Sequence, residues 1–172
     1  MNASRISIES VRPMIDCGRF PAKRVIGDEF TVEADIFTHG SDRIRADLKY
    51  RKIGNMKWKA SQMHLGYNDR WTGSFKVEEE GVYEYTIDAW IDSYSTVLAN
   101  IESWYRGGES ISSDLLVVSA LLSEIMKKTA GREKSFLKER FSAMKDASPP
   151  EVIEILKGPQ LNSLVQRYQK KL

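Results

Sequence analysis

The chain has 172 residues, of which 41% are hydrophobic and 29% are charged, a composition typical of a soluble globular protein. Its net charge of +2 argues against binding of nucleic acid, which needs a strongly basic surface. No apolar run approaches the roughly 20 residues that a membrane span requires, so no membrane partner is expected.

The single cysteine and the amino terminus bear on the cellular compartment. Cys17 is the only cysteine, so no internal disulfide can form, and a reducing compartment is expected. The amino terminus lacks the continuous apolar segment of a signal peptide. The sequence therefore predicts a cytoplasmic protein.

Up to about Trp90, hydrophobic residues alternate with polar ones, which is the pattern of half-buried strands. Turn signals that contain Gly, Asn, Asp or Ser separate the alternating segments. Six or seven short strands at this spacing are typical of an immunoglobulin-like antiparallel β-sandwich, which we expect over residues 1–91. The segments centre on residues 6–8, 30–36, 44–50, 58, 71–77 and 83–89.

Beyond Trp90 the hydrophobic period changes to 3.6, so residues 92–172 are expected to form a small helical bundle. The first helix is capped by Asp92 or Ser93 and stops at residues 107–108. The second runs to Gly131 and is hydrophobic over most of its circumference, which predicts burial between neighbouring helices. A third precedes the proline pair at 149–150, a short piece follows, and the last helix carries an apolar stripe that reaches Leu172. The predicted fold class is α+β.

The sequence lacks the common signatures of a catalytic or cofactor site. His39 and His64 have no partner at metal-ligand spacing, and neither glycine-rich phosphate loops nor a nucleophile elbow occur. Glycosidases need paired carboxylates, but the acids here fall on polar strand faces or in the run 78–80. We therefore predict no catalytic residue, no metal and no cofactor in this chain.

Residues 11–24 combine two prolines, one glycine and four cations just before the first long alternating strand. One interpretation is a loop that closes one end of the sandwich, because Pro and Gly favour such connections. In the other, Arg19, Lys23 and Arg24 form a cationic surface that docks on an anion or on a neighbouring domain.

Three aromatic residues, Trp58, Tyr67 and Trp71, lie near one another in sequence around the loop at 66–70. Exposed aromatic faces can stack on sugar rings, so these residues could form a glucan-binding platform. Large aromatic residues more often belong to the core, and the sequence leaves both interpretations open for Trp58 and Trp71.

The residues at the two ends of the strand-rich half also carry a family resemblance. Val-Arg-Pro at 11–13, Asp-Cys-Gly-Arg-Phe-Pro-Ala-Lys-Arg at 16–24, Trp-x-Gly-x-Phe at 71–75 and Gly-x-Tyr-x-Tyr at 81–85 together resemble the amino-terminal region of the alpha-1,4-glucan:maltose-1-phosphate maltosyltransferases. These are bacterial enzymes of glycoside hydrolase family 13, the α-amylase family. The helical half is similar in kind to a helical insert of that family.

The resemblance implies a parent enzyme that transfers maltosyl from α-maltose 1-phosphate to the non-reducing end of an α-1,4-glucan. Its catalytic carboxylates would lie on a (β/α)8 barrel outside this chain. The sandwich and the helical insert would contribute to a homodimer interface, with residues 93–106 and the last helix as expected contact regions. The alternatives are a stand-alone α-glucan-binding module and a protein-interaction module. Whether the chain dimerises or binds glucan alone, and which glucan is extended, stays open.

Overall fold

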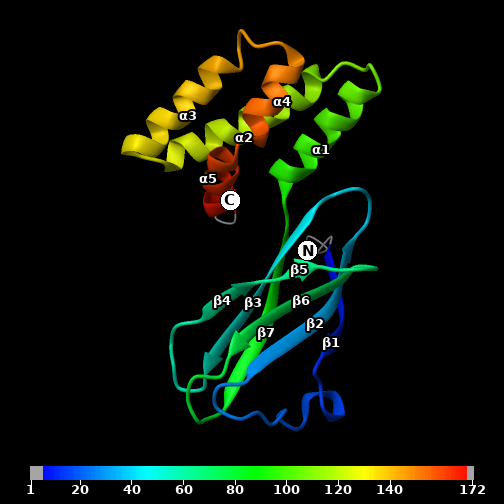
Figure 1. Ribbon diagram of the computed structural model, residues 1–172, viewed down its shortest axis with the longest axis vertical. Coiled ribbons are helices and arrows are strands. Elements are labelled where there is room, and N and C mark those ends of the chain that lie inside the picture. Colours follow the sequence, from blue (N-terminus) through cyan, green and yellow to red (C-terminus); the bar gives the residue numbers. More distant parts are fainter. Residues whose placement is uncertain (1–5, 170–172) are drawn as a thin grey trace, which may run out of the picture. The chain divides into compact units, whose positions relative to one another are not determined.

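The structure is a computed structural model, and it describes residues 6–169 (Figure 1). The chain forms two compact units that meet at the peptide bond between Ile91 and Asp92. We propose that these units are the domains 1–91 and 92–172, and each is described by itself below.

The first unit consists of two antiparallel sheets, which makes it the sandwich-like part of an α+β fold, as predicted. One sheet has the strand order β1-β2-β6-β5 and the other has the order β4-β3-β7. The first matches the A-B-E-D sheet of an immunoglobulin sandwich, and β3 and β7 take the places of strands C and F. The strands are β1 (Ile6–Arg12), β2 (Glu29–Thr38), β3 (Ile44–Lys52), β4 (Lys59–Gln62), β5 (His64–Leu65), β6 (Arg70–Lys76) and β7 (Tyr83–Ile91).

The alternation in the sequence corresponds to the inner and outer faces of the two sheets. In β2 every second residue from Phe30 to Ile36 is buried, and in β3 Ala46 and Leu48 are buried. The rings of Tyr50 and Phe75 stack across the core, with centroids 4.1 Å apart. Stacked aromatic pairs of this kind add to the energy of apolar burial, so the core joins strands of both sheets.

At one side of the sandwich the chain itself crosses between the sheets. Met63 connects β4 in one sheet to β5 in the other, and its backbone N–H donates to the carbonyl of Ala46 at 2.9 Å. The Met63 side chain is buried against Gly73, where an added Cβ would lie 2.8 Å from Met63 Cγ. Glycine at this position lets the crossover pack tightly.

The structure places the start of residues 11–24 differently from the prediction. Val11 and Arg12 are the end of β1, which pairs with β2 and has an irregularity between Glu9 and Arg12. The connecting segment therefore begins at Pro13. The sequence pattern did not show this because the irregularity breaks the alternation.

Five helices form the second unit. Asp92 caps the first helix, as one of the two predicted caps, by accepting a hydrogen bond from the backbone N–H of Ser95 at 2.9 Å. Ser148 and Glu151 form a capping box before the proline pair. The helices are α1 (Ser93–Arg106), α2 (Ser112–Lys128), α3 (Gly131–Ala143), α4 (Pro149–Lys157) and α5 (Pro159–Gln169).

The end predicted for the second helix was wrong, because α2 ends at Lys128 and Gly131 is the first residue of α3. Leu172 lies outside the described residues.

The helical unit has its own hydrophobic core. Tyr94 is the largest of its fully buried side chains, and its hydroxyl donates to the carbonyl of Leu156 at 2.7 Å. This bond links α1 to the last turn of α4, where helix carbonyls lack intrahelical partners. The other buried core residues are Val97, Ile101, Ile111, Val118, Leu122, Ile125, Leu137, Val152, Ile153, Leu156, Leu161, Leu164 and Val165.

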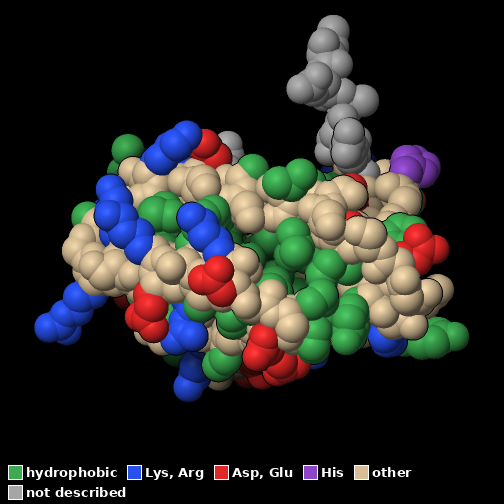
Figure 2. All heavy atoms as spheres, turned by 90° about the horizontal axis from the view of Figure 1, so that it is seen from above, with side chains coloured by type: hydrophobic (Ala, Val, Ile, Leu, Met, Phe, Trp, Pro, Cys, Tyr) green, Lys and Arg blue, Asp and Glu red, His purple; other side chains and the backbone are tan. Residues whose placement is uncertain are grey.

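One prediction about α2 was wrong. Although the helix is hydrophobic around most of its circumference, Leu116 is 73% exposed and Val117 is 51% exposed. Neighbouring helices cover only the side that carries Val118, Leu122 and Ile125. Hydrophobic side chains reach the surface between charged ones on the face viewed in Figure 2. No helix within residues 6–169 has both the length and the apolar character of a membrane span.

The buried hydroxyl of Tyr94 leads to a prediction about alkaline pH. Burial raises the pKa of Tyr94 far above its ordinary value of 10.0, so the folded protein holds this proton more tightly than the unfolded chain does. The stabilising effect is therefore complete below pH 10 and declines as the pH rises above 10. We expect the free energy of unfolding of the wild type to fall from pH 9 to pH 11 more steeply than that of Tyr94→Phe.

Urea unfolding followed by circular dichroism at a series of pH values measures this difference. At pH 8 Tyr94→Phe should be less stable by about 1 kcal/mol, the usual value of one hydrogen bond. Tyr105→Phe is the matched control, because Tyr105 is exposed. Identical pH profiles for the wild type and Tyr94→Phe would contradict the prediction.

Candidate functional site: an apolar groove beside strand β7

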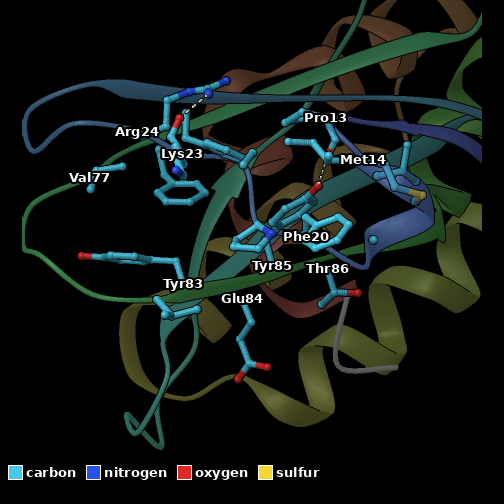
Figure 3. Close-up of a pocket in the computed structure, with 18 of the residues that line it drawn as sticks. Pro13, Met14, Phe20, Lys23, Arg24, Val77, Tyr83, Glu84, Tyr85 and Thr86 are labelled. Carbon is cyan, nitrogen blue, oxygen red and sulfur yellow. Dashed lines mark hydrogen bonds between the residues drawn. The ribbon is translucent and has the colours of Figure 1, made fainter.

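A groove of about 960 Å³ lies in the sandwich unit, between β7 and the segment that follows β1 (Figure 3). Its lining comes from three places in the sequence: residues 8–24, the ends of β2 and β6, and residues 81–87. The lining residues include Pro13, Met14, Ile15, Gly18, Arg19, Phe20, Lys23, Arg24, Phe30, Val82, Tyr83, Glu84 and Tyr85. Most of the proline- and cation-containing segment at residues 11–24 therefore forms one wall of the groove.

Local hydrogen bonds shape this wall. Ile15 and Phe20 form an isolated antiparallel bridge around the short 3₁₀ turn η1 (Asp16–Gly18). The backbone N–H of Gly18 donates to the carbonyl of Ile15 at 3.0 Å, and Gly18 has φ = +84°. Glycine adopts this left-handed conformation without the steric cost that a side chain brings. Gly18 therefore favours the tight turn that returns the chain to the groove.

A hydrogen bond fastens the wall to β7. The hydroxyl of Tyr85 donates to the carbonyl of Pro13 at 2.6 Å (Figure 3). Burial raises the pKa of Tyr85, so the hydroxyl keeps the proton that it donates at neutral pH. This bond joins residues 72 positions apart in the sequence and holds the groove at its width.

The three predicted docking cations all line this groove. The guanidinium of Arg24 lies 5.1 Å from the centroid of the Phe30 ring and donates to the carbonyl of Lys23 at 2.8 Å. Arg19 pairs with Asp16 at 3.5 Å, but its side chain is 76% exposed. The three cations thus give one wall of the groove a positive charge.

Large hydrophobic side chains remain at the surface of the groove. Phe20 is 59% exposed, Val82 is 56% exposed, and Met14 and Ile15 are also exposed. Single exposed hydrophobic residues are common, but a group that lines one groove marks an interaction surface. The arrangement is suited to binding an apolar chain with a charged or polar flank.

The three aromatic residues of the predicted glucan platform do not share one environment. Trp71 is 7% exposed and its Nε1 donates to the carbonyl of Ile36 at 3.1 Å, so it is part of the core. Trp58 precedes β4, and the guanidinium of Arg51 lies 4.4 Å from its ring centroid. Tyr67 is 93% exposed in the loop before β6. Strands β4 and β5 separate Trp58 from Tyr67 along the chain.

Several carboxylates on the surface of the sandwich are paired with cations. Arg70 bonds Asp35 Oδ1 at 2.6 Å and Glu33 Oε2 at 3.3 Å. The hydrogen bond from Arg70 holds the pKa of Asp35 below its ordinary value. A general acid for glycoside hydrolysis needs a raised pKa, so this pair of carboxylates does not suit that role. Within residues 6–169, no group of three His, Cys, Asp or Glu side chains is placed to hold a metal ion.

The sequence pattern predicted the cations of the groove but not its second wall, which residues 81–87 form. The alternation at 83–89 predicts a strand, but it does not indicate that Tyr83 and Tyr85 line a groove with residues 13–24. A useful signal was the strand count, because an immunoglobulin sandwich has a further strand G beside F. Among the described residues no strand occupies that position next to β7.

The architecture defines the class to which the chain belongs: an immunoglobulin-like sandwich with an apolar groove, followed directly in the sequence by a helical unit. A family model described as "Alpha-1,4-glucan:maltose-1-phosphate maltosyltransferase, domain N/S" matches residues 4–172. The chain therefore belongs to the alpha-1,4-glucan:maltose-1-phosphate maltosyltransferase family and corresponds to its amino-terminal region, as the resemblance indicated.

Curated relatives carry the name alpha-1,4-glucan:maltose-1-phosphate maltosyltransferase. The protein of Picrophilus torridus is 36% identical over 97% of this chain and 26% of its own length. That of Chlorobaculum tepidum is 45% identical over 69% of this chain and 18% of its own length. That of Methylacidiphilum infernorum is 34% identical over 95% of this chain and 24% of its own length. The chain thus spans about a quarter or less of these relatives.

The bond between Tyr85 and Pro13 predicts a specific loss. Tyr85→Phe removes the donor and leaves the carbonyl of Pro13 without this partner, which should lower the free energy of unfolding by about 1 kcal/mol. Amide hydrogen exchange of residues 14–20 should become faster, because their attachment to β7 is weaker.

Urea unfolding and hydrogen exchange measured by mass spectrometry test this expectation. Tyr83→Phe is the matched control, because the hydroxyl of Tyr83 makes only long, exposed bonds of 3.3 Å to the backbone of Glu79. Equal effects of the two substitutions would show that the Tyr85 bond does not hold the wall.

Proposed function

We propose that this chain is the non-catalytic amino-terminal dimerisation and scaffold region of a cytoplasmic maltosyltransferase. The parent enzyme transfers maltosyl from α-maltose 1-phosphate to the non-reducing end of α-1,4-glucans. The observation that carries the proposal is the family match over residues 4–172, together with relatives about four times as long. Catalysis by a (β/α)8 barrel requires roughly 250 further residues, and the extra length of the relatives accommodates them.

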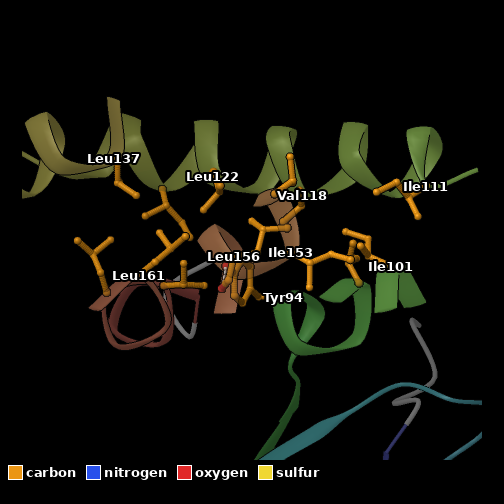
Figure 4. Packing of buried hydrophobic residues seen from close by; sticks show 14 residues of the cluster. Tyr94, Ile101, Ile111, Val118, Leu122, Leu137, Ile153, Leu156 and Leu161 are labelled. Atoms are coloured by element: carbon orange, nitrogen blue, oxygen red, sulfur yellow. Dashed lines mark hydrogen bonds between the residues drawn. The ribbon is translucent and has the colours of Figure 1, made fainter. Parts of the chain in front are cut away.

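The outer surface of the helical unit is the proposed dimer contact. Figure 4 shows Val118 and Leu122 of α2 pointing toward Ile153 and Leu156, so the inner side of α2 serves the unit's own core. The apolar stripe of α5, expected as a contact region, is also used there, because Leu161, Leu164 and Val165 are buried. The exposed apolar side chains that remain are Trp104 and Tyr105 at the end of α1 and Leu116 and Val117 on α2.

Dimerisation through this surface is tested in the full-length enzyme. Leu116→Asp places a charge in the proposed contact and should shift the sedimentation coefficient from dimer to monomer at micromolar concentration, because an unpaired charge at an interface costs several kcal/mol. The fold should persist, since Leu116 is 73% exposed.

The matched control is Met56→Asp, at a residue of the sandwich unit that is 91% exposed. An unchanged dimer in Leu116→Asp would exclude α2 from the interface. A wild-type enzyme that sediments as a monomer would remove dimerisation from the proposed function.

The scaffold role is proposed to use Arg19, Lys23 and Arg24 as the contact with the catalytic part. Arg24→Glu reverses a charge in that contact, so it should lower the thermal midpoint of the full-length enzyme more than that of the 172-residue chain. Within the 172-residue chain, the substitution loses the cation–π contact with Phe30, about 0.5–1 kcal/mol, and the exposed hydrogen bond to the carbonyl of Lys23. Differential scanning calorimetry and maltosyl transfer assays measure both effects.

Lys57→Glu serves as the control, because Lys57 is an exposed cation of the same unit outside the groove. If Arg24→Glu lowers both midpoints equally and leaves activity unchanged, the three cations do not dock on the catalytic part.

A further inference from the structure

The last turn of α5 makes different contacts from the rest of that helix. α5 packs against α2 and α4, and its buried apolar residues, Leu161, Leu164 and Val165, all lie in its first two turns. The last turn, residues 167–169, carries three side chains with polar ends. A helix of 11 residues is too short to be stable by itself in water. The contacts of these three side chains therefore decide whether the last turn stays in place.

The third of these side chains, Gln169, reaches the start of α1 and is only 8% exposed. With its amide oriented to satisfy its neighbours, its oxygen accepts from the backbone N–H of Ser93 and Tyr94, at 2.5 and 3.0 Å. Its nitrogen donates to Asp92 Oδ1 at 3.1 Å. The first N–H groups of a helix have no partner within the helix, and Asp92 accepts from that of Ser95. Gln169 thus completes the cap of α1 from the last turn of α5.

The other two side chains reach one carboxylate in the first turn of α3. The hydroxyl of Tyr168 donates to Glu133 Oε2 at 2.7 Å, and Arg167 Nη1 lies 3.0 Å from Glu133 Oε1. A hydrogen bond to a carboxylate is stronger than one between neutral groups. The side chain of Arg167 is 61% exposed, so its ion pair contributes less. The last turn of α5 therefore connects to both α1 and α3.

We propose that residues 167–169 form a releasable strap. In the closed form the strap completes the cap of α1 and holds the first turn of α3, and in the released form it frees both helix starts. Release is local, because Leu161, Leu164 and Val165 stay buried and water can bond the freed polar groups. The ring of Tyr168 is partly buried against the core, so release has a cost and the closed form predominates.

The strap makes the start of α1 respond to whatever displaces the end of α5. A ligand or a neighbouring segment that binds the released form shifts the population toward it, and the shift appears at α1 and α3 together. The inference does not depend on the proposed function, because all of these contacts lie within the helical unit.

Amide exchange of the 172-residue chain, followed residue by residue by NMR, tests the strap. The amides of Ser93 and Tyr94 should be protected, although the first positions of a helix normally bond water. Their exchange should be insensitive to low concentrations of urea, because local opening exposes little surface, whereas the amide of the buried residue Ile101 should respond to urea. Unprotected amides at Ser93 and Tyr94, or amides that exchange only together with that of Ile101, would overturn the inference.

Gln169→Leu removes the amide but retains a side chain of similar size. The amides of Ser93 and Tyr94 should then exchange about 5- to 30-fold faster, which is the effect of losing one or two ordinary hydrogen bonds. Gln160→Leu is the matched control, because Gln160 is exposed in the first turn of the same helix. Equal acceleration in the two variants would contradict the role of Gln169 in the cap.

A substitution in α3 separates a strap from a local cap. Glu133→Ala removes the acceptor that holds the other two side chains of the last turn, so it should also speed exchange of the amides at 93–94. Glu139→Ala is the matched control, because Glu139 is exposed on the same helix and pairs with its neighbour Arg140 at 3.9 Å. Amides at 93–94 that exchange at the wild-type rate in Glu133→Ala would overturn the strap.

The double variant decides whether the two contacts act through one device. In Gln169→Leu with Glu133→Ala, the amides at 93–94 should exchange no faster than in Gln169→Leu alone, because the cap is already lost. An acceleration equal to the product of the two single effects would show that the contacts are independent, and it would overturn the inference.

Discussion

Each sheet of the sandwich has one apolar face, and the rest of that unit depends on burying the two faces against each other. Neither sheet covers its own apolar face, and removal of both faces from water is the favourable term that holds the two sheets together. The stacked rings of Tyr50 and Phe75, with Phe30 and Tyr85 beside them, join the sheets. The sides of the sandwich are closed by different means. A covalent crossover at Met63 closes one, whereas the segment at 13–24 and one tyrosine hydroxyl border the other.

This difference explains why the groove lies where it does. At the crossover, β4 continues through Met63 into β5, so the chain itself closes that side. On the opposite side, no strand of residues 6–169 other than β3 lies next to β7, and the apolar side chains of Met14, Phe20 and Val82 are exposed. The helical unit, by contrast, has a core of its own, and the exposed large hydrophobic side chains among its described residues lie on α1 and α2.

Much of the fold could be predicted from the sequence, because period two and period 3.6 report directly on which side of a strand or helix is buried. The strands from Phe30 to Ile36 and from Ile44 to Tyr50 are examples, as is the cap at Asp92. Periodicity could not predict which of two similar aromatic residues lies inside. Trp71 is buried on the central strand β6, whereas Trp58 directly precedes β4 and is 39% exposed. Nor could it predict that Leu116 and Val117 are exposed, since that depends on how few helices surround α2.

The candidate site was predictable in part. The cations Arg19, Lys23 and Arg24 were apparent from their clustering among Pro and Gly, but the facing wall of the groove comes from residues about 60 positions later in the chain.

Cys17, the only cysteine, is exposed in η1 between the groove residues Ile15 and Gly18. The chain therefore carries a native attachment point for a thiol-reactive fluorophore at the border of the groove. Changes in its emission or anisotropy would follow the filling and emptying of the groove in real time, without adding or removing any residue of this region.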